Sequence, residues 1–267
     1  MPGNFFSRHR PLLLKIGAFF LALLLWEAVA LLFGERVLLA SPVDVLRRLY
    51  EYAADFRLHG PVLYSTVRIM AGVLIGLLVG CAAALLAGRF PLAETLLYPY
   101  MVTIRSVPVA SFVVLAMIWL SAGQFSGFIA FLIVLPIVYN ALLGALRGMD
   151  RALSEMADVF HFRFRDRLFY VWLPQLRPAL LSASATAVGL GWKSGVAAEL
   201  IGVARGGVGW EIYLCKQSVD TAGLFGWTLI IVLCSLVCEK LFLLGLRAAL
   251  GGGKEKRHAR SARHGAV

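Results

Sequence analysis

Six long apolar runs constrain this chain more than any other feature. A helix that spans a lipid bilayer needs about 20 mostly apolar residues, and six segments meet this requirement: 12–33, 65–88, 97–120, 125–146, 179–203 and 224–249. Because 60% of the residues are hydrophobic and only 15% are charged, there is too little polar surface to cover a soluble core of this size. The sequence predicts an all-α, polytopic membrane protein with six transmembrane helices.

The first apolar run also has features of a secretory signal peptide. Arg8, Arg10 and Lys15 precede it, and Ala28-Val29-Ala30 resembles a cleavage site. The apolar sequence nevertheless continues through Phe33, so we favour an uncleaved spanning helix.

Basic residues are distributed unevenly between the loops. With the N-terminus inside, sixteen Lys and Arg residues fall in cytoplasmic segments and six in outer segments. Cytoplasmic loops of membrane proteins carry such an excess, so both termini are predicted to be cytoplasmic. The formal net charge of +11 is explained by this asymmetry, and we expect no nucleic-acid partner. The polar tail 251–267 is expected to be disordered.

Two loops are patterned. In the outer loop, Ser41-Pro42-Val43-Asp44 is typical of a helix start, and a short interfacial helix is expected there, with an apolar face formed by Val45, Leu46, Leu49 and Tyr50. The cytoplasmic loop 148–178 is expected to hold an amphipathic helix after an N-cap at Asp150. Its apolar face would comprise Met149, Leu153, Met156, Ala157 and Phe160, opposite Arg151, Ser154, Glu155 and Asp158. Pro174 and Pro178 should stop any further helix before the fifth span.

This cytoplasmic loop resembles the signature loop of permeases of ATP-binding-cassette (ABC) importers. The family pattern is E-A-A, three residues, G, nine residues and I-x-L-P. The matching positions here are Glu155, Met156, Ala157, His161, Val171, Leu173 and Pro174. His161 stands where the family usually has glycine, which puts the local turn in question, because only glycine adopts positive φ freely.

Other motifs are similar to the nitrate, sulfonate and taurine branch of that family. They are Arg105-Ser106-Val107-Pro108, Trp119 with Gly123, Pro136-Ile137-Val138-Tyr139-Asn140, Trp192, Val196-Ala197-Ala198-Glu199 and Gly207-Val208-Gly209. The resemblance implies a permease core at 65–250 with a coupling loop at 148–178, after an N-terminal helix and outer loop at 1–64. It also implies a bacterial cytoplasmic-membrane location, an ABC ATPase and an external solute-binding protein. A second permease subunit is implied as well, as a second copy in a homodimer, which we favour, or as a related permease in a heterodimer.

No sequence pattern indicates catalysis. The chain lacks a phosphate-binding G-x-x-x-x-G-K-[ST] loop, so ATP and magnesium are expected on the partner ATPase and no cofactor on this chain. All five histidines lie outside the apolar runs, and the four cysteines form no metal-binding pattern. A self-contained secondary transporter or channel is the alternative, although no inverted repeat is visible; an intramembrane enzyme would need a nucleophile or metal constellation.

Small residues and isolated charges mark the spans. The second run repeats small residues every four positions, and so does the fifth, which favours close helix packing; the residues are Gly72, Gly76, Gly80, Ala84 and Gly88, and Ala183, Ala187, Gly191 and Gly195. If the two faces pack together, Arg68 and Glu199 should meet as an ion pair. Arg105 and Lys193 are candidates for the path of an anionic solute, or they reach the membrane surface or pair structurally.

Overall fold

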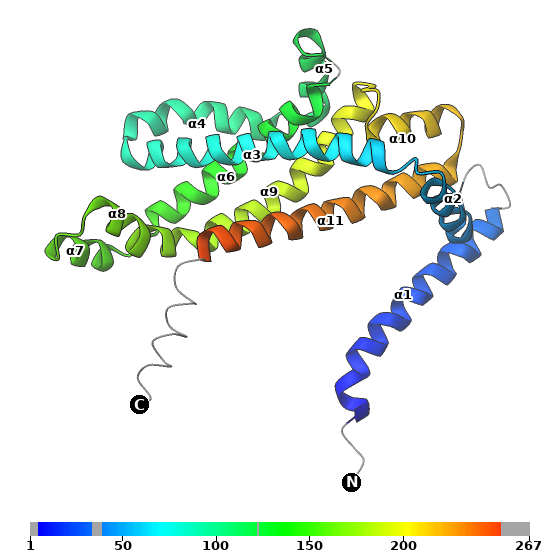
Figure 1. Ribbon diagram of the computed structural model, residues 1–267, viewed down its shortest axis with the longest axis horizontal. Coiled ribbons are helices and arrows are strands. Elements are labelled where there is room, and N and C mark those ends of the chain that lie inside the picture. The colour runs from blue at the N-terminus through cyan, green and yellow to red at the C-terminus, as the bar shows by residue number, and fades with distance from the viewer. Residues whose placement is uncertain (1–4, 34–38, 122, 252–267) are drawn as a thin grey trace.

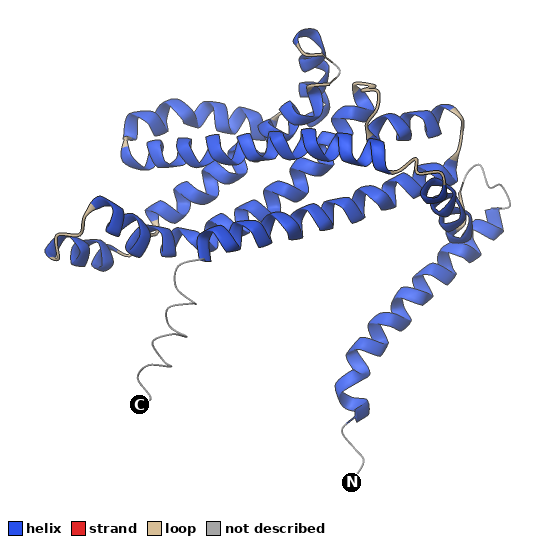
Figure 2. Ribbon diagram, viewed as in Figure 1, coloured by secondary structure: helices blue, strands red, loops and turns tan. Residues whose placement is uncertain are grey.

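The computed structural model describes residues 5–33, 39–121 and 123–251, and every regular element in these ranges is a helix (Figure 2). This confirms the all-α fold. The predicted tail beyond Gly251 lies outside the described residues. In chain order the helices are α1 (Phe5–Phe33), α2 (Pro42–Ala54), α3 (His59–Arg89), α4 (Pro91–Ser106), α5 (Val109–Trp119), α6 (Phe125–Arg147), α7 (Arg151–Val159), α8 (Phe164–Arg167), the π-helix η1 (Leu168–Trp172), α9 (Leu173–Ile201), α10 (Val208–Gln217) and α11 (Thr221–Gly251).

The centre of the molecule is a bundle of α3, α6, α9 and α11 (Figure 1). Val73, Val134, Val188, Trp192 and Trp227 are buried together between these four helices. The indole N–H of Trp192 donates a hydrogen bond of 3.0 Å to the carbonyl of Ile231, which joins α9 to α11. One end of the bundle, here called the α7 end, carries α7 and α8, and the other, the α10 end, carries α2 and α10 (Figure 1).

Three helices, α3, α6 and α11, are long and apolar enough to cross a membrane among the described residues. The bent pair α4 and α5 would make a fourth, and α1 contributes the shorter apolar stretch Phe20–Leu32. The 29-residue α9 is long enough, but serines, glycines, a threonine and Lys193 interrupt its apolar sequence. The protein is therefore polytopic, and α9 differs in composition from the other central helices.

The third apolar run is not one straight span, as the sequence analysis expected. The chain turns by 106° between α4 and α5. Pro108 lacks a backbone N–H and restricts the residue before it to extended conformations, and Val107 accordingly has φ −81° and ψ 131°. The expectation that Pro174 and Pro178 stop any helix before the fifth span is wrong. The helical run continues through η1 into α9, with Pro174 in the first turn of α9 and Pro178 inside it.

The helix α2 forms where the sequence predicts it. The Ser41 hydroxyl accepts a hydrogen bond from the N–H of Asp44, and Pro42 occupies the first turn. Its predicted apolar face is split, however. Val45 is buried and Leu49 packs on the core near α11, whereas Leu46 and Tyr50 are exposed. One side of α2 is thus part of the protein core.

The two ladders of small residues pack against different partners, not against each other. A Cβ on Gly72 would overlap the carbonyl oxygen of Gly127, so α3 and α6 meet backbone to backbone there. Gly76 and Gly80 continue this contact with α6. On α9, Gly191 faces Val73 and Gly195 faces Ile69, with a Cβ at Gly195 only 2.6 Å from the Ile69 side chain. Small residues allow this close approach where lipid provides no hydrophobic driving force.

Candidate functional site

The helix α7 starts and ends with specific caps. The Asp150 carboxylate accepts a hydrogen bond of 2.9 Å from the N–H of Ala152, which confirms the predicted N-cap. The N–H of Asp150 donates to the side-chain oxygen of Gln175, at 2.9 Å. Because Gln175 belongs to α9, this bond ties the start of α7 to a central helix of the bundle.

His161 adopts the left-handed conformation after α7, with φ 49°. Its N–H donates to the carbonyl of Asp158, and the N–H of Phe162 donates to that of Ala157, the paired bonds of a Schellman helix end. The turn that a glycine would make most easily is therefore made by a histidine, at a conformational cost of roughly 1 kcal/mol. The same conformation occurs at Phe56, Val203 and Val219, which follow α2, α9 and α10.

The coupling-loop residues named from the sequence divide into buried and exposed groups. Ala157 and Val171 are buried, and Leu173 is half-buried. Glu155, Met156, His161 and Pro174 are exposed, and so are the neighbouring Val159 and Phe160, at 74% and 68%. A hollow of about 440 Å³ lies beside α7, lined by Leu153, Met156, Phe162, Asp166, Tyr170 and Val171. The α7 end therefore presents apolar side chains at its surface.

One ion pair holds this loop together. The guanidinium of Arg167 donates to the carboxylate of Asp158 at 2.6 Å, across the turn between α7 and α8. It also lies 5.7 Å from the ring centre of Trp172, at the end of η1. Both contacts of Arg167 are local in sequence, whereas the bond between Asp150 and Gln175 connects the loop to α9.

Glu199 is fully buried near the α10 end of α9, where its carboxylate anchors the start of α10. Its Oε2 accepts a hydrogen bond of 2.6 Å from the Ser65 hydroxyl and one of 3.2 Å from the N–H of Gly209. The Ser65 hydroxyl in turn accepts from the N–H of Val208. A carboxylate at the N-terminus of a helix is stabilised by the unpaired N–H groups and the helix dipole.

The expected ion pair between Arg68 and Glu199 is not formed, although both are described. The Arg68 guanidinium lies over the ring of Tyr64, 4.0 Å from its centre, and against Gly123. The reason for the missing pair is that the two small-residue faces have different partners, so the Oε2 atom of Glu199 is bonded to Ser65 and to the start of α10 instead.

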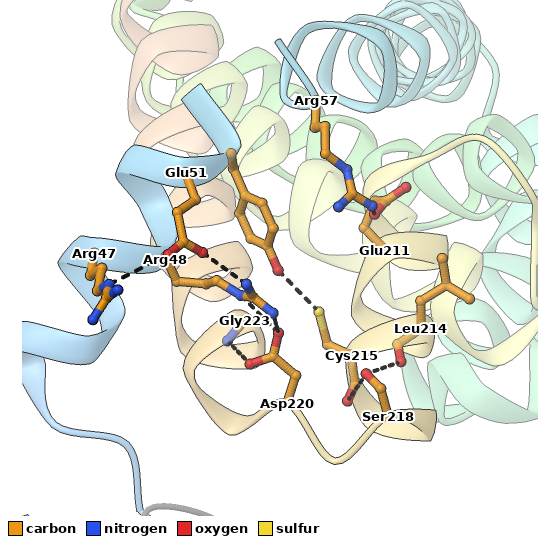
Figure 3. A network of polar contacts seen from close by, with 11 residues as sticks. Arg47, Arg48, Glu51, Arg57, Glu211, Leu214, Cys215, Ser218, Asp220 and Gly223 are labelled. Atoms are coloured by element: carbon orange, nitrogen blue, oxygen red, sulfur yellow. Dashed lines mark hydrogen bonds and ion pairs between the residues drawn. The ribbon is translucent and has the colours of Figure 1, made fainter. Parts of the chain in front are cut away.

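A polar network joins α2 to α10 and α11 (Figure 3). Arg48 donates to Asp220 at 2.6 and 3.0 Å and to Glu51 at 2.8 Å, and Asp220 also accepts from the N–H of Gly223. Tyr52 contacts the Cys215 sulfur at 3.6 Å. Burial raises the pKa of the Tyr52 phenol and of the Cys215 thiol, so both stay protonated. Unlike the α7 end, this region links residues that are far apart in sequence.

The remaining candidate charges lie on exposed surfaces. Arg105 ends α4 beside the bend and is exposed, and Lys193 is exposed on α9. Two charged residues within the last apolar run, Glu239 and Lys240 on α11, were not among the predicted site residues. The sequence could have indicated them, because a charged residue inside an apolar run is costly in a membrane and commonly marks a functional site.

Comparison with known proteins places this arrangement in context. Residues 72–248 match the family described as the binding-protein-dependent transport system inner membrane component. The chain is 29% identical over 194 residues to a putative aliphatic sulfonates transport permease protein of Bacillus subtilis, covering 72% of this chain and 70% of that protein.

Two further relatives have the same general role. The taurine transport system permease protein of Escherichia coli is 27% identical over 247 residues, 90% of this chain and 88% of that protein. The nitrate import permease protein of Synechocystis is 26% identical over 204 residues, 72% and 73% of the two chains. These are transport subunits and not enzymes. The matched region spans the central bundle and the α7 loop, and the chain belongs to the family of inner-membrane permease components of binding-protein-dependent ABC transport systems.

Proposed function

We propose that this chain is the permease subunit of an importer that moves a small sulfonate-, nitrate- or taurine-like solute across the bacterial cytoplasmic membrane. The relatives named for such solutes support this solute class. ATP and magnesium would be bound by a separate ABC ATPase, and the solute would be delivered by an external binding protein. A second copy of the chain would complete the transport path.

The α7 end is the surface proposed for the ATPase. The observation that carries this proposal is the exposure of Met156, Val159 and Phe160 on a capped helix at one end of a membrane bundle. Apolar side chains gathered in this way mark an interaction surface. The excess of Lys and Arg in the predicted cytoplasmic segments supports an orientation with the α7 end and both termini in the cytoplasm.

Contact with the ATPase is tested by reversing one exposed charge on α7. In Glu155→Arg, an exposed carboxylate becomes a guanidinium, and this mismatch should lower recovery of the ATPase with the tagged permease by roughly tenfold. Asp55→Arg makes the same exchange at an exposed position beyond α2 and should leave recovery unchanged. A second variant, Ala157→Trp, overfills a buried position and should also release the ATPase.

The measurement is co-purification of the two subunits from the membrane, with ATP-dependent uptake recorded in parallel. If Glu155→Arg and Ala157→Trp keep both normal co-purification and normal uptake, the α7 end is not the ATPase contact. If no ATPase accompanies the unaltered permease, the importer assignment itself fails in favour of a self-contained transporter.

A further inference from the structure

One face of α9 is polar along much of its length. Ser182, Thr186 and Lys193 are exposed, and the half-buried Gly189 lies between them. At 3.6 residues per turn these four positions share one face. The half-buried Gln175, bonded to the N–H of Asp150, continues this face to the α7 end. The exposed face of α11, in contrast, is mainly apolar, although it also carries the exposed Lys240; its exposed apolar side chains are Leu229, Val232, Leu233, Leu236, Val237, Leu241 and Leu244. Polar side chains within a membrane typically face water or a bound solute rather than lipid.

A carboxylate from α11 reaches this polar face. Glu239 is half-buried, and its Oε2 lies 3.7 Å from the position that a Cβ on Gly189 would occupy. Gly189 and Lys193 are four residues apart on one face of α9. The Glu239 carboxylate and the root of the Lys193 side chain are therefore separated by about one helical turn, roughly 5.4 Å along α9.

Both charges lie deep in their helices. Glu239 is eleven residues from the nearer end of the apolar helix Thr221–Leu250, which corresponds to about 16 Å. Lys193 is eight residues before the end of α9, or about 12 Å. A charge near the centre of a bilayer is costly. Among the described residues, nevertheless, no ion pair joins Lys193 and Glu239 to each other or to another side chain.

We propose that Lys193 and Glu239 form a binding site for a small zwitterionic solute on the polar face of α9. The Lys193 ammonium would bind the acidic group of the solute, and the Glu239 carboxylate would bind its ammonium group. An amino-sulfonate, with opposite charges separated by a short carbon chain, fits this arrangement, and the absence of a side chain at Gly189 leaves the carboxylate accessible. This inference rests on the transport function proposed above and specifies its solute class.

The test measures direct binding to the full-length permease in lipid nanodiscs. The probe is radiolabelled 2-aminoethanesulfonate, and the competitors are ethanesulfonate and ethylammonium, each of which carries only one of the two charges. A hydrogen bond to a charged group contributes about 1.5–3 kcal/mol, so each competitor should bind at least roughly tenfold more weakly than the zwitterion.

Two variants separate the roles of the charges. Lys193→Met and Glu239→Gln should each weaken binding of 2-aminoethanesulfonate by roughly tenfold or more. Glu239→Gln should in addition bind ethanesulfonate as well as it binds the zwitterion, because only the ammonium contact is lost. Lys240→Met is the matched control, since this neighbouring charge is exposed on a different face of α11, and its affinity should equal that of the unaltered protein.

Several results would overturn the proposal. They are no binding of 2-aminoethanesulfonate in the millimolar range, equal affinity of the unaltered permease for ethanesulfonate, or unchanged affinity in both variants. Should Glu239→Gln fail to fold, Glu239→Asp, which keeps the charge but shortens its reach, must lower the affinity. Co-purification of the ATPase is recorded on the same preparations. If 2-aminoethanesulfonate does not bind but the ATPase co-purifies, only this site is overturned. If 2-aminoethanesulfonate binds but no ATPase co-purifies, only the importer assignment is overturned.

Discussion

The two ends of the bundle are held together in different ways. At the α10 end, Ser65, Glu199 and Gly209 connect α3, α9 and α10 through buried hydrogen bonds, and Arg48 reaches Asp220, 172 residues away in sequence. At the α7 end, the pair of Asp158 and Arg167 is only nine residues apart and partly exposed. The α10 end is stabilised by charged and polar contacts between distant parts of the chain, whereas the α7 end exposes apolar residues and is linked to the bundle by the bond from Asp150 to Gln175. This difference suits the ATPase contact proposed for the α7 end, because elements that move are drawn from the less stable parts of a protein.

The largest effect should come from the buried bonds at the α10 end. Ser65→Ala removes the donor to Glu199 and the acceptor for the N–H of Val208, leaving a buried carboxylate and a buried N–H short of partners. We expect a loss of about 2–3 kcal/mol of stability, seen as a lower thermal unfolding temperature and faster hydrogen exchange in α10. Ser106→Ala, at an exposed serine with only a local bond, is the control. Equal unfolding temperatures for the two variants would show that the buried bonds contribute no more than an exposed one.

A pair of aspartate variants compares the two ends directly. Asp220→Ala removes the two hydrogen bonds to Arg48 and the cap on the Gly223 N–H. It should lower the free energy of unfolding by about 2 kcal/mol. Asp158→Ala removes an ion pair whose carboxylate is 63% exposed. It should lower the free energy of unfolding by less than about 1 kcal/mol. Thermal unfolding in one detergent measures both. The contrast between the ends would be wrong if Asp158→Ala were the more destabilising variant.

The smallest effect concerns the left-handed turns. Val219, which follows α10, and His161, which follows α7, both have positive φ, at 56° and 49°. Glycine removes the steric cost at such positions but loses more chain entropy on folding. Val219→Gly should stabilise the protein by up to about 1 kcal/mol, because β-branched residues are especially unfavourable there. His161→Gly should gain less, since histidine tolerates this region better. Unfolding temperatures in parallel measure both, and a decrease for Val219→Gly would contradict the assigned strain.

The long apolar helices and the amphipathic helix α7 could be predicted because their signals are local. Apolar runs of bilayer length require helices whatever else the chain does, since lipid offers no partners for backbone groups. The caps at Ser41 and Asp150 and the turn at His161 follow from the same short-range rules. The spacing from Glu155 to Pro174 identified the loop for the same reason, because the motif depends only on positions close together along the chain.

Which residues meet across the bundle was decided only by the tertiary structure. Pro108 marks a break in the sequence, but the 106° between α4 and α5 depends on what each helix packs against. The two ladders of small residues look alike in the sequence. Only the structure shows that the ladder of α3 packs against α6, and that the ladder of α9 packs against branched side chains of α3. Glu199 therefore met Ser65 and Gly209 instead of Arg68, and Glu239 came to lie beside Gly189. A helix fixes which residues share its own face, while the neighbour of that face follows from the packing of the whole bundle.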